Sequence, residues 1–296
     1  MKFTKMQGAG NDFILIEAGE LALDWPQMAR AMCDRRFGVG GDGLLLVLSS
    51  DVADFKMRIF NSDGSEAEAC GNGLRCLAKY VINMGLVDAE MQEISVETMS
   101  GISRIELHKA GDKLAKIQVG MGGPKFGAED IPVMIEPAKA DLLDIKPILN
   151  YPVVVGSDEL FLNFVSMGNP HAVYFIQQPV SDFPLSRLGP EVERHRIFPN
   201  RANFEVARVI SRQLIEGRVW ERGVGETLAC GTGACAIAVA ARLHGYIDNK
   251  VDIKLPGGTL DIEWDGVGEV FLGGPAEIVF TGEWPGTSSN RNSKRI

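Results

Sequence analysis

An internal repeat at an offset of 160 positions constrains this chain of 296 residues more than any other feature. The segment Ala-Cys-Gly-Asn-Gly at residues 69–73 returns as Ala-Cys-Gly-Thr-Gly at residues 229–233. The same offset pairs Glu66 with Glu226, Asn61 with Glu221 and Gly43 with Asn203. At an offset of 158, Gly10-Asn11 pairs with Gly168-Asn169. Because several pairs of positions share nearly the same offset, they indicate a duplication and predict two similar lobes.

The repeat predicts how the chain is divided. We expect an N-terminal lobe at residues 1–120 and a C-terminal lobe at residues 141–281. Residues 121–140 include a stretch rich in proline and glycine and are expected to link the lobes. The chain ends in polar and basic residues, and we expect residues 282–296 to form a disordered tail.

Local patterns predict an α+β fold dominated by short strands. Helical patterns occupy residues 26–34, 73–84 and 233–243, and the last two follow the repeated glycine motifs. In each lobe we expect mostly antiparallel strands wrapped around a helix. The runs that predict strands are residues 13–16, 44–47, 56–60, 94–98, 116–119, 161–165, 172–176, 204–210 and 269–272.

Composition excludes some classes of partner. The net charge of −9 and the pI of about 5.1 argue against a general nucleic-acid binder and against attachment to anionic membranes. The sequence contains no apolar run of membrane-spanning length and no signal-peptide core near its N-terminus, so we expect a cytoplasmic protein. In that compartment its five cysteines are expected to be reduced rather than paired in disulfides.

Each repeated motif places a cysteine, Cys70 or Cys230, immediately before a glycine-rich helix start. A helix N-terminus presents unpaired backbone N–H groups and partial positive charge, so it can bind a carboxylate. The same field favours a thiolate, and we expect it to lower the pKa of the thiol. Each motif therefore offers an anion site beside a reactive sulfur.

Two such motifs facing each other would suit inversion of a stereocentre. One thiolate would remove a proton from the α-carbon of an amino acid, and the opposite thiol would return a proton to the other face. The sequence has no obvious lysine motif for pyridoxal phosphate. The helix N-termini would instead stabilise the charge that develops on the substrate carboxylate. We therefore expect the active site in the cleft between the lobes, with no cofactor.

As a set, the motifs of this chain resemble those of the diaminopimelate epimerase family, in order from residue 6 to about residue 274. The resemblance implies interconversion of LL- and meso-diaminopimelate for lysine and peptidoglycan synthesis. It also implies two pseudo-symmetric lobes, each a β-barrel-like sheet around a central helix, and a homodimer. The matching segments are residues 8–13, 35–43, 60–65, 70–76, 167–171, 203–205, 220–227 and 229–233.

The resemblance also implies a role for individual residues. Cys70 and Cys230 match the acid–base pair of the family, and His171 and Glu221 match residues that tune the thiols. Gly43 stands where many members carry glutamine, so a contact of that side chain with substrate is absent here. The implied substrate-binding residues are Asn11, Asn61, Gly71, Asn72, Asn169, Asn203, Glu221, Arg222, Gly231 and Thr232.

Other interpretations remain open from the sequence alone. Cys33, Cys76 and Cys235 are expected to be small buried residues. The spacings Cys70–Cys76 and Cys230–Cys235 are not those of a structural zinc site, and no metal site is expected. A histidine such as His171, taken by itself, is more often structural than functional. Its place after Gly168-Asn169-Pro170, which mirrors Gly10-Asn11, favours a functional role as much as a structural one. The alternatives to the epimerase are a related thiol-dependent racemase with another amino acid as substrate, and a binding module in which Cys70 and Cys230 form a switchable disulfide.

Overall fold

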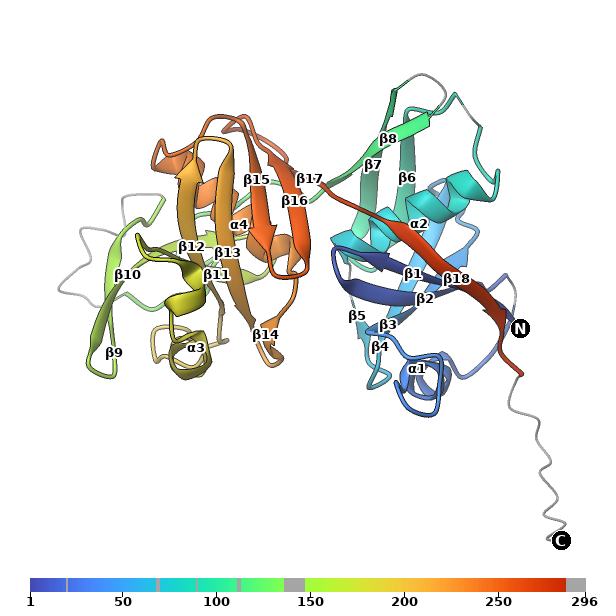
Figure 1. Cartoon of the computed structure of the whole chain (residues 1–296), viewed down its shortest axis with the longest axis horizontal. Helices are drawn as coiled ribbons and strands as arrows, with labels where there is room; N and C mark the ends of the chain where they lie inside the picture. The colour runs from blue at the N-terminus through green and yellow to red at the C-terminus, as the bar shows by residue number, and fades with distance from the viewer. Residues whose placement is uncertain (20, 68–69, 89, 111–112, 136–146, 286–296) are drawn as a thin grey trace, which may run out of the picture.

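The computed structural model describes residues 1–19, 21–67, 70–88, 90–110, 113–135 and 147–285, which form two lobes side by side (Figure 1). Eighteen strands and four α-helices are described. Those of the first half are β1 (Lys2–Gly8), β2 (Asn11–Glu17), α1 (Trp25–Cys33), β3 (Gly43–Leu48), β4 (Phe55–Asn61), β5 (Glu66–Ala67), α2 (Gly71–Asn83), β6 (Glu93–Thr98), β7 (Gly101–Ala110) and β8 (Lys113–Gly120).

The second half repeats this succession of strands and helices, with a short 3-10 helix added. Its elements are β9 (Tyr151–Val155), β10 (Asp158–Ser166), β11 (Pro170–Phe175), the 3-10 helix η2 (Val180–Asp182), α3 (Leu185–Glu193), β12 (Asn203–Ser211), β13 (Leu214–Glu221), β14 (Gly225–Thr227), α4 (Gly231–Leu243), β15 (Lys250–Leu255), β16 (Gly258–Glu263), β17 (Phe271–Gly273) and β18 (Glu277–Glu283). Helices α1 and α3, like α2 and α4, begin 160 positions apart.

Strand pairing is the same in both lobes. In the first, β2 lies antiparallel to β1 and parallel to β3, and β4 lies antiparallel to β3 and parallel to β6, which continues antiparallel through β7 to β8. In the second, β10, β11, β12, β13, β15, β16 and β17 follow the same order and directions. The predicted α+β fold of two pseudo-symmetric, mostly antiparallel lobes is confirmed.

The register also follows the repeat. Phe13 lies opposite Gly43 in the parallel pair β2–β3, and His171 lies opposite Asn203 in the parallel pair β11–β12. Near the ends of β4 and β13, equivalent ion pairs join Arg58 to Glu66 and Arg218 to Glu226. The duplication therefore extends from the sequence motifs to the pairing of individual residues.

Each lobe has one strand in addition to those of its own repeat unit. In the sequence, this strand comes directly after the repeat unit of the other lobe. After β8 the chain enters the C-terminal lobe, where β9 pairs with β10, and after β17 it returns to pair β18 with β1. In Figure 1 the red strand β18 accordingly lies beside the blue strands β1 and β2. Strands β8 and β17 pair with each other at the junction. The N-terminal lobe is therefore β1–β8 with β18, and the C-terminal lobe is β9–β17.

This exchange changes the boundaries expected from the sequence. The C-terminal lobe was expected to extend to residue 281, but β18 belongs to the N-terminal sheet. The tail expected from residue 282 is wrong for residues 282–285, because β18 reaches Glu283 and the Trp284 amide donates to the Met1 carbonyl. Residues 286–296 lie outside the described residues. In the expected linker, Ile131 and Val133 are buried in the core of the C-terminal lobe, whereas residues 136–146 lie outside the described residues.

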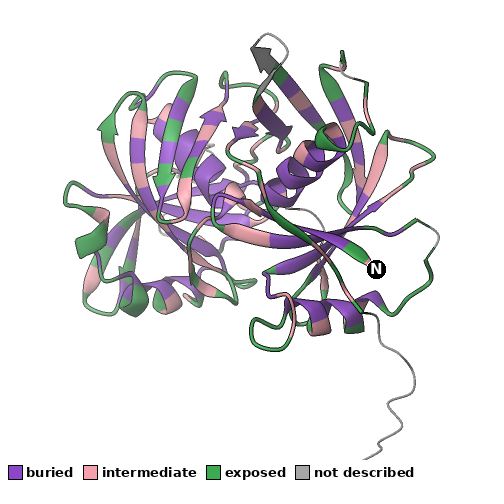
Figure 2. Ribbon diagram, turned by 45° about the vertical axis from the view of Figure 1, so that its right-hand side comes forward, coloured by how far each residue is buried: buried purple, intermediate pink, exposed green. Residues whose placement is uncertain are grey.

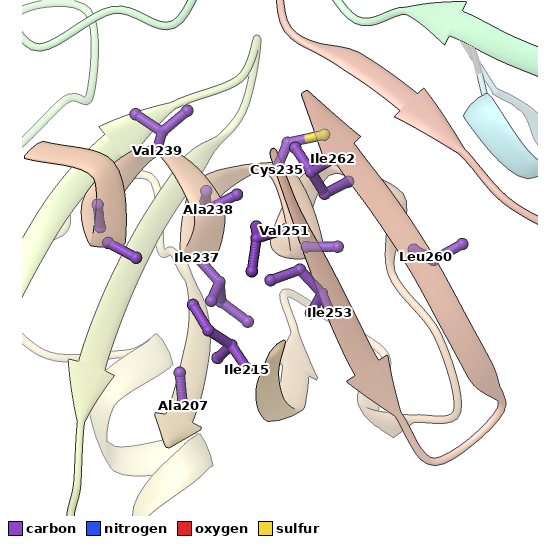
Figure 3. Packing of buried hydrophobic residues seen from close by; sticks show 14 of the residues in the cluster. Ala207, Ile215, Cys235, Ile237, Ala238, Val239, Val251, Ile253, Leu260 and Ile262 are labelled. Atoms are coloured by element: carbon purple, nitrogen blue, oxygen red, sulfur yellow. The ribbon is translucent and has the colours of Figure 1, made fainter. Parts of the chain in front are cut away.

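Both central helices are buried by the strands around them (Figure 2). Helix α4 is apolar on nearly every side, which is typical of a helix enclosed by other elements. Its side chains Ile237 and Val239 belong to one core cluster with Ile215, Val251 and Ile253 from the surrounding strands (Figure 3). Helix α2 is enclosed in the same way by the core of the N-terminal lobe. The N-termini of both helices are consequently held by a closely packed frame.

Candidate active site at two helix N-termini

Cys70 and Cys230 occupy the N-cap positions of α2 and α4 in nearly the same conformation. Their backbones are extended, with φ and ψ of −148° and 112° for Cys70 and −127° and 116° for Cys230. In each case the carbonyl of the cysteine accepts the first helical hydrogen bond, from Leu74 or Ala234. Each sulfur therefore lies beside backbone N–H groups that have no partner within the helix.

The two helix starts converge on one side chain, Leu272 of β17. A Cβ atom added to Gly71 would lie 2.8 Å from Leu272 Cδ2, and one added to Gly231 would lie 3.1 Å from the same atom. The Gly231 position also lies 4.0 Å from Asn72 Oδ1. Glycine is required here because the N-termini of α2 and α4 approach each other across this leucine.

On the N-terminal side, Asn11 links the cysteine to a network of charges. The Cys70 thiol lies 3.9 Å from Asn11 Oδ1, and Asn72 Nδ2 donates to the same oxygen across 3.4 Å. Asn11 Nδ2 donates to Asp42 at 2.6 Å, which in turn accepts from Arg35 at 2.7 Å. The Asp42 carboxylate thus fixes which end of the Asn11 amide faces the sulfur.

On the C-terminal side, Thr232 and Asn169 occupy the equivalent positions. The Cys230 sulfur lies 3.5 Å from Thr232 Oγ1, which accepts from Asn169 Nδ2 at 3.4 Å. Before each asparagine a glycine, Gly10 or Gly168, has a φ of 85° or 88°, the left-handed region that glycine adopts without a Cβ clash. Equivalent turns therefore bring Asn11 and Asn169 to the two helix starts.

His171 extends this contact chain into the core. Its Nε2 lies 2.9 Å from Asn169 Oδ1, and its Nδ1 lies 2.7 Å from Glu205 Oε1. Both His171 and Glu205 are fully buried. Glu205 lies in the matching segment 203–205 but is not among the predicted site residues, although a carboxylate at a buried position of a strand is a signal that the sequence offers.

Glu221 lies at the end of β13 and influences both sulfurs. Its carboxylate raises the pKa of the Cys70 thiol and that of the Cys230 thiol. A negative charge disfavours a thiolate, so Glu221 favours the protonated form of both. Glu221 Oε1 accepts a hydrogen bond of 2.5 Å from the Thr227 hydroxyl, which holds the carboxylate in place.

Burial is the largest influence on the pKa of both thiols, and it raises the pKa of each. The backbone N–H groups of Asn72 and Gly73 lower the pKa of Cys70, and that of Gly233 lowers the pKa of Cys230, as the helix argument predicts. Desolvation nevertheless outweighs them. The expected net lowering is therefore wrong, and both cysteines favour the protonated form.

The remaining predicted side chains, those of Asn61, Asn203 and Arg222, lie at or next to strand ends. Asn203 Nδ2 donates to the Pro170 carbonyl at 3.1 Å, and its Oδ1 accepts from the Arg222 amide at 2.9 Å. The Arg222 guanidinium donates to the Asn200 carbonyl, and Asn61 Nδ2 donates to Ser65 Oγ at 2.9 Å. These contacts orient the polar groups of the three residues.

At Gly43 the backbone approaches too closely for a side chain. A Cβ atom there would lie 2.9 Å from the Phe60 carbonyl oxygen of the neighbouring strand β4. A glutamine at this position would require a shift of the strand backbone. Close packing of β3 against β4 therefore favours glycine at position 43, and with glycine the contact that a glutamine side chain would make is absent.

The other cysteines do not join this arrangement. Cys33, Cys76 and Cys235 are buried, and all five cysteines are free thiols. Burial raises the pKa of Cys33 to about 11 and that of Cys76 and Cys235 to about 12. Among the described residues, no three His, Cys, Asp or Glu side chains lie close enough to hold a metal ion. No helix in the described ranges is long and apolar enough to cross a membrane.

Comparison with the sequences of known proteins indicates a single family. The family model described as diaminopimelate epimerase matches residues 3–127 and 163–279. The diaminopimelate epimerase of Moorella thermoacetica is 46% identical over 288 residues, which covers 96% of this chain and 99% of the relative. That of Methanococcus maripaludis strain C6 is 45% identical over 290 residues, with the same coverage.

Solved structures of lower identity share the fold. A phenazine biosynthesis protein of the PhzF family from Bacillus anthracis has a TM-score of 0.65 at 19% identity, with 95% of this chain and 98% of that chain covered. A probable proline racemase from Agrobacterium radiobacter K84 has a TM-score of 0.66 at 12% identity, with 96% and 92% covered. At these identities the likeness concerns the two-lobed architecture alone.

Proposed function

The chain belongs to the diaminopimelate epimerase family, and we propose that it interconverts LL- and meso-2,6-diaminopimelate by inverting one α-carbon with Cys70 and Cys230. The observation that carries this proposal is that Cys70 and Cys230 are equivalent N-cap residues of two helices whose first residues, Gly71 and Gly231, both approach Leu272. A pair of sulfurs related by pseudo-twofold symmetry suits the two faces of one carbon. No cofactor takes part in the proposed reaction.

In the proposed reaction one thiolate removes the α-proton and the opposite thiol donates its own proton to the other face. The substrate carboxylate would lie at the two helix N-termini, where the N–H groups of Asn72 and Thr232 face it. Negative charge that spreads onto the carboxylate is stabilised there without a metal or an electron sink. After each turnover the two sulfurs have exchanged roles, because one has gained the proton and the other has lost it.

Raised pKa values of the thiols are compatible with this chemistry. A buried thiolate with a high pKa is a stronger base than an exposed one, and the α-proton of an amino acid is only weakly acidic. The same burial excludes water, which would otherwise compete for the carbanion. The cost is that only a small fraction of free enzyme carries the thiolate at neutral pH.

We assign the distal amino-acid group of the substrate to Asn61, Asn203, Glu221 and Arg222. Arg222 can bind a carboxylate with two parallel hydrogen bonds, and Glu221 can accept from an ammonium group. A substrate without the second amino-acid group would leave these partners unpaired, at a cost of about 1–3 kcal/mol for each buried group. This cost would discriminate diaminopimelate from proline or glutamate.

Substitution of each cysteine tests the mechanism directly. Cys70→Ser and Cys230→Ser should each reduce epimerisation by orders of magnitude, because a hydroxyl is a far weaker acid–base partner than a thiol. Cys33→Ala, which changes a buried thiol in α1, should retain activity. Assays are run without pyridoxal phosphate. Near-normal epimerisation by either serine variant would exclude the two-thiol mechanism.

A β-halogenated diaminopimelate separates proton abstraction from inversion. Elimination of HX from it needs one base, with the α-proton passing to sulfur and halide leaving with its electron pair. Each serine variant should therefore still eliminate from one stereoisomer of this analogue. Faster racemisation of L-proline than epimerisation of diaminopimelate by the unmodified enzyme would contradict the assigned substrate.

We further propose a homodimer in the cytoplasm. The resemblance to the family supports the dimer, and the five free thiols fit a reducing compartment. The chain has a mass of 32.1 kDa, so light scattering should give twice this value at micromolar concentration. A mass of one chain under these conditions would contradict the dimer.

A further inference from the structure

Arg75 is a fully buried arginine one turn into α2, directly behind Cys70. Its Nη2 donates a hydrogen bond of 2.8 Å to Asn72 Oδ1. Its Nε and Nη1 have no hydrogen-bond partner among the described residues. An arginine remains protonated in proteins, so a positive charge lies inside the molecule beside the helix start.

This charge has no counterpart in the other lobe. The position 160 residues further along is Cys235, which is also fully buried. Arg75 also reaches the chain beyond β17, where a Cβ on Gly274 would lie 3.2 Å from its Nη2. A single guanidinium therefore lies at the junction of two otherwise similar lobes and breaks their symmetry.

Stability does not explain this placement. Burying a charged group without a full set of partners costs free energy, and an apolar residue of similar volume is often neutral or stabilising at such a site. The carboxylate of Asp261 acts on Arg75 electrostatically, but Asp261 is already paired with Lys116. The effect of Arg75 on its neighbours offers a better explanation.

The nearest effect is on the amide of Asn72. Because Asn72 Oδ1 accepts from Arg75, its Nδ2 faces the opposite way, 3.4 Å from Asn11 Oδ1 beside the Cys70 sulfur. The hydrogen bond to a charged donor fixes this orientation and polarises the amide. Arg75 thereby positions a donor at the site that we assign to the substrate carboxylate.

The charges around the two sulfurs also differ. Cys70 faces the N–H groups of Asn72 and Gly73 and the Arg75 guanidinium, with Glu221 opposing them. Cys230 faces two carboxylates, Glu221 and Glu205, with the Thr232 hydroxyl and the Gly233 N–H opposing them. The titratable groups that act electrostatically on Arg75 are Cys70 at the N-cap of α2, Cys76 on α2, Cys235 on α4 and Asp261 on β16.

We propose that Arg75 is a positioning residue that fixes Asn72 and makes Cys70, rather than Cys230, the thiol that ionises first. This proposal rests on the proposed function, because it assigns the resting base and acid of the same two-cysteine site. In the fraction of free enzyme that holds one thiolate, Cys70 carries the negative charge and Cys230 retains its proton. Two interacting thiols lose their protons in succession, and Arg75 determines the order.

The test is the pH dependence of iodoacetamide alkylation at each cysteine, followed by peptide mass spectrometry. The pH midpoint is compared rather than the absolute rate, because Cys70 is more exposed than Cys230. The variants are Arg75→Met, Arg75→Lys and the control Lys79→Met, which removes a positive charge one turn further along the same helix. Melting temperatures confirm that each variant is folded.

In the unmodified protein we expect Cys70 to have the lower midpoint. Arg75→Met should raise the Cys70 midpoint by about one pH unit, a roughly tenfold loss of thiolate near neutral pH, and leave that of Cys230 nearly unchanged. Arg75→Lys keeps the charge without the forked geometry and should give an intermediate value. Lys79→Met should change neither midpoint.

Two results would overturn the proposal: a lower midpoint at Cys230 than at Cys70 in the unmodified protein, or an unchanged Cys70 midpoint in folded Arg75→Met. If Arg75→Met does not fold, the test uses the Cys70 and Cys230 midpoints of the unmodified protein and the Cys70 midpoint of Arg75→Lys. Alkylation needs no turnover, so its outcome is independent of whether diaminopimelate is the substrate. If the unmodified enzyme does not epimerise diaminopimelate, only the proposed function is contradicted.

Discussion

The buried pair of His171 and Glu205 lies at the end of a chain of contacts that leads to a reactive sulfur. Glu205 contacts His171, His171 contacts Asn169, Asn169 donates to Thr232, and Thr232 contacts Cys230. In the N-terminal lobe the residue equivalent to His171 is Phe13. The two thiols therefore share a backbone frame but have different polar supports.

Glu205 should make stability depend on pH in a specific direction. Burial raises its pKa above the usual value of 4.5, so the folded chain holds this proton more tightly than the unfolded chain. The resulting stabilisation is present below pH 4.5 and is lost as the pH rises through the raised pKa. Glu205→Gln cannot titrate and should not show this loss.

The measurement is the melting temperature of the unmodified protein minus that of Glu205→Gln, followed from pH 4.5 upward. We expect this difference to fall as the pH rises, until Glu205 is ionised in the folded state. Other titrating groups are common to both proteins and largely cancel in the difference. A difference that stays constant or increases with pH would show that the pKa of Glu205 is not raised.

At the scale of elements, Leu272 sets the spacing between the starts of α2 and α4. Its side chain is fully buried and contacts the first residue of each helix, Gly71 and Gly231. The helices are otherwise held by separate cores. Because a proton must pass between each sulfur and one carbon, a change of this spacing affects chemistry as well as stability.

Leu272→Ala should reduce stability by about 2–5 kcal/mol, the usual cost of truncating a buried leucine. It should also reduce the turnover number of epimerisation, because the helix N-termini can shift into the space. Leu255→Ala, in the same core cluster but on β15, should cost similar stability and leave turnover nearly unchanged. Urea unfolding and steady-state kinetics of both variants are compared. Equal loss of turnover in the two variants would contradict the spacing role.

Much of the element pattern could be predicted from local sequence. The predicted helices at residues 26–34, 73–84 and 233–243 correspond to α1, α2 and α4, within two residues at each end. Helix α3 was missed because Gly189 and Pro190 lie inside it and interrupt the helical pattern. Strand β18 was missed because it pairs with β1 at the other end of the chain, which no local pattern encodes.

The candidate site also contains residues that local sequence indicates and residues that it does not. Cys70 and Cys230 could be proposed from the sequence because the repeat and the glycines after them form a local signal. Arg75 and Glu205 were not identified, because their importance depends on complete burial and on contacts between distant segments. The net direction of the thiol pKa was also wrong, since burial is a property of the whole fold and not of one helix start.

For the molecule as a whole, the exchange of β9 and β18 couples the two lobes. Each lobe is completed by a strand that follows the other half of the repeat, and β8 pairs with β17 between them. A lobe cut at the repeat boundary would therefore expose an unpaired strand edge. The proposed active site lies where this coupling holds the two helix starts together.

We expect the lobes to unfold together in urea. Trp25 lies in the N-terminal lobe and Trp264 in the C-terminal lobe, so variants that retain only one of the tryptophans report on each lobe separately. Their fluorescence transitions should coincide, because loss of either lobe removes strands from the other. Two separated midpoints in these variants would show that the lobes are independent.

Isotope exchange during epimerisation in D₂O tests the two-thiol account most directly. At early times from LL-diaminopimelate, the account predicts deuterium at the inverted α-carbon of the meso product and hydrogen in the recovered substrate. This asymmetry follows because the proton removed by one sulfur is not the proton delivered by the other. Deuterium appearing in the recovered substrate as fast as in the product, or a product that keeps the original hydrogen, would contradict it.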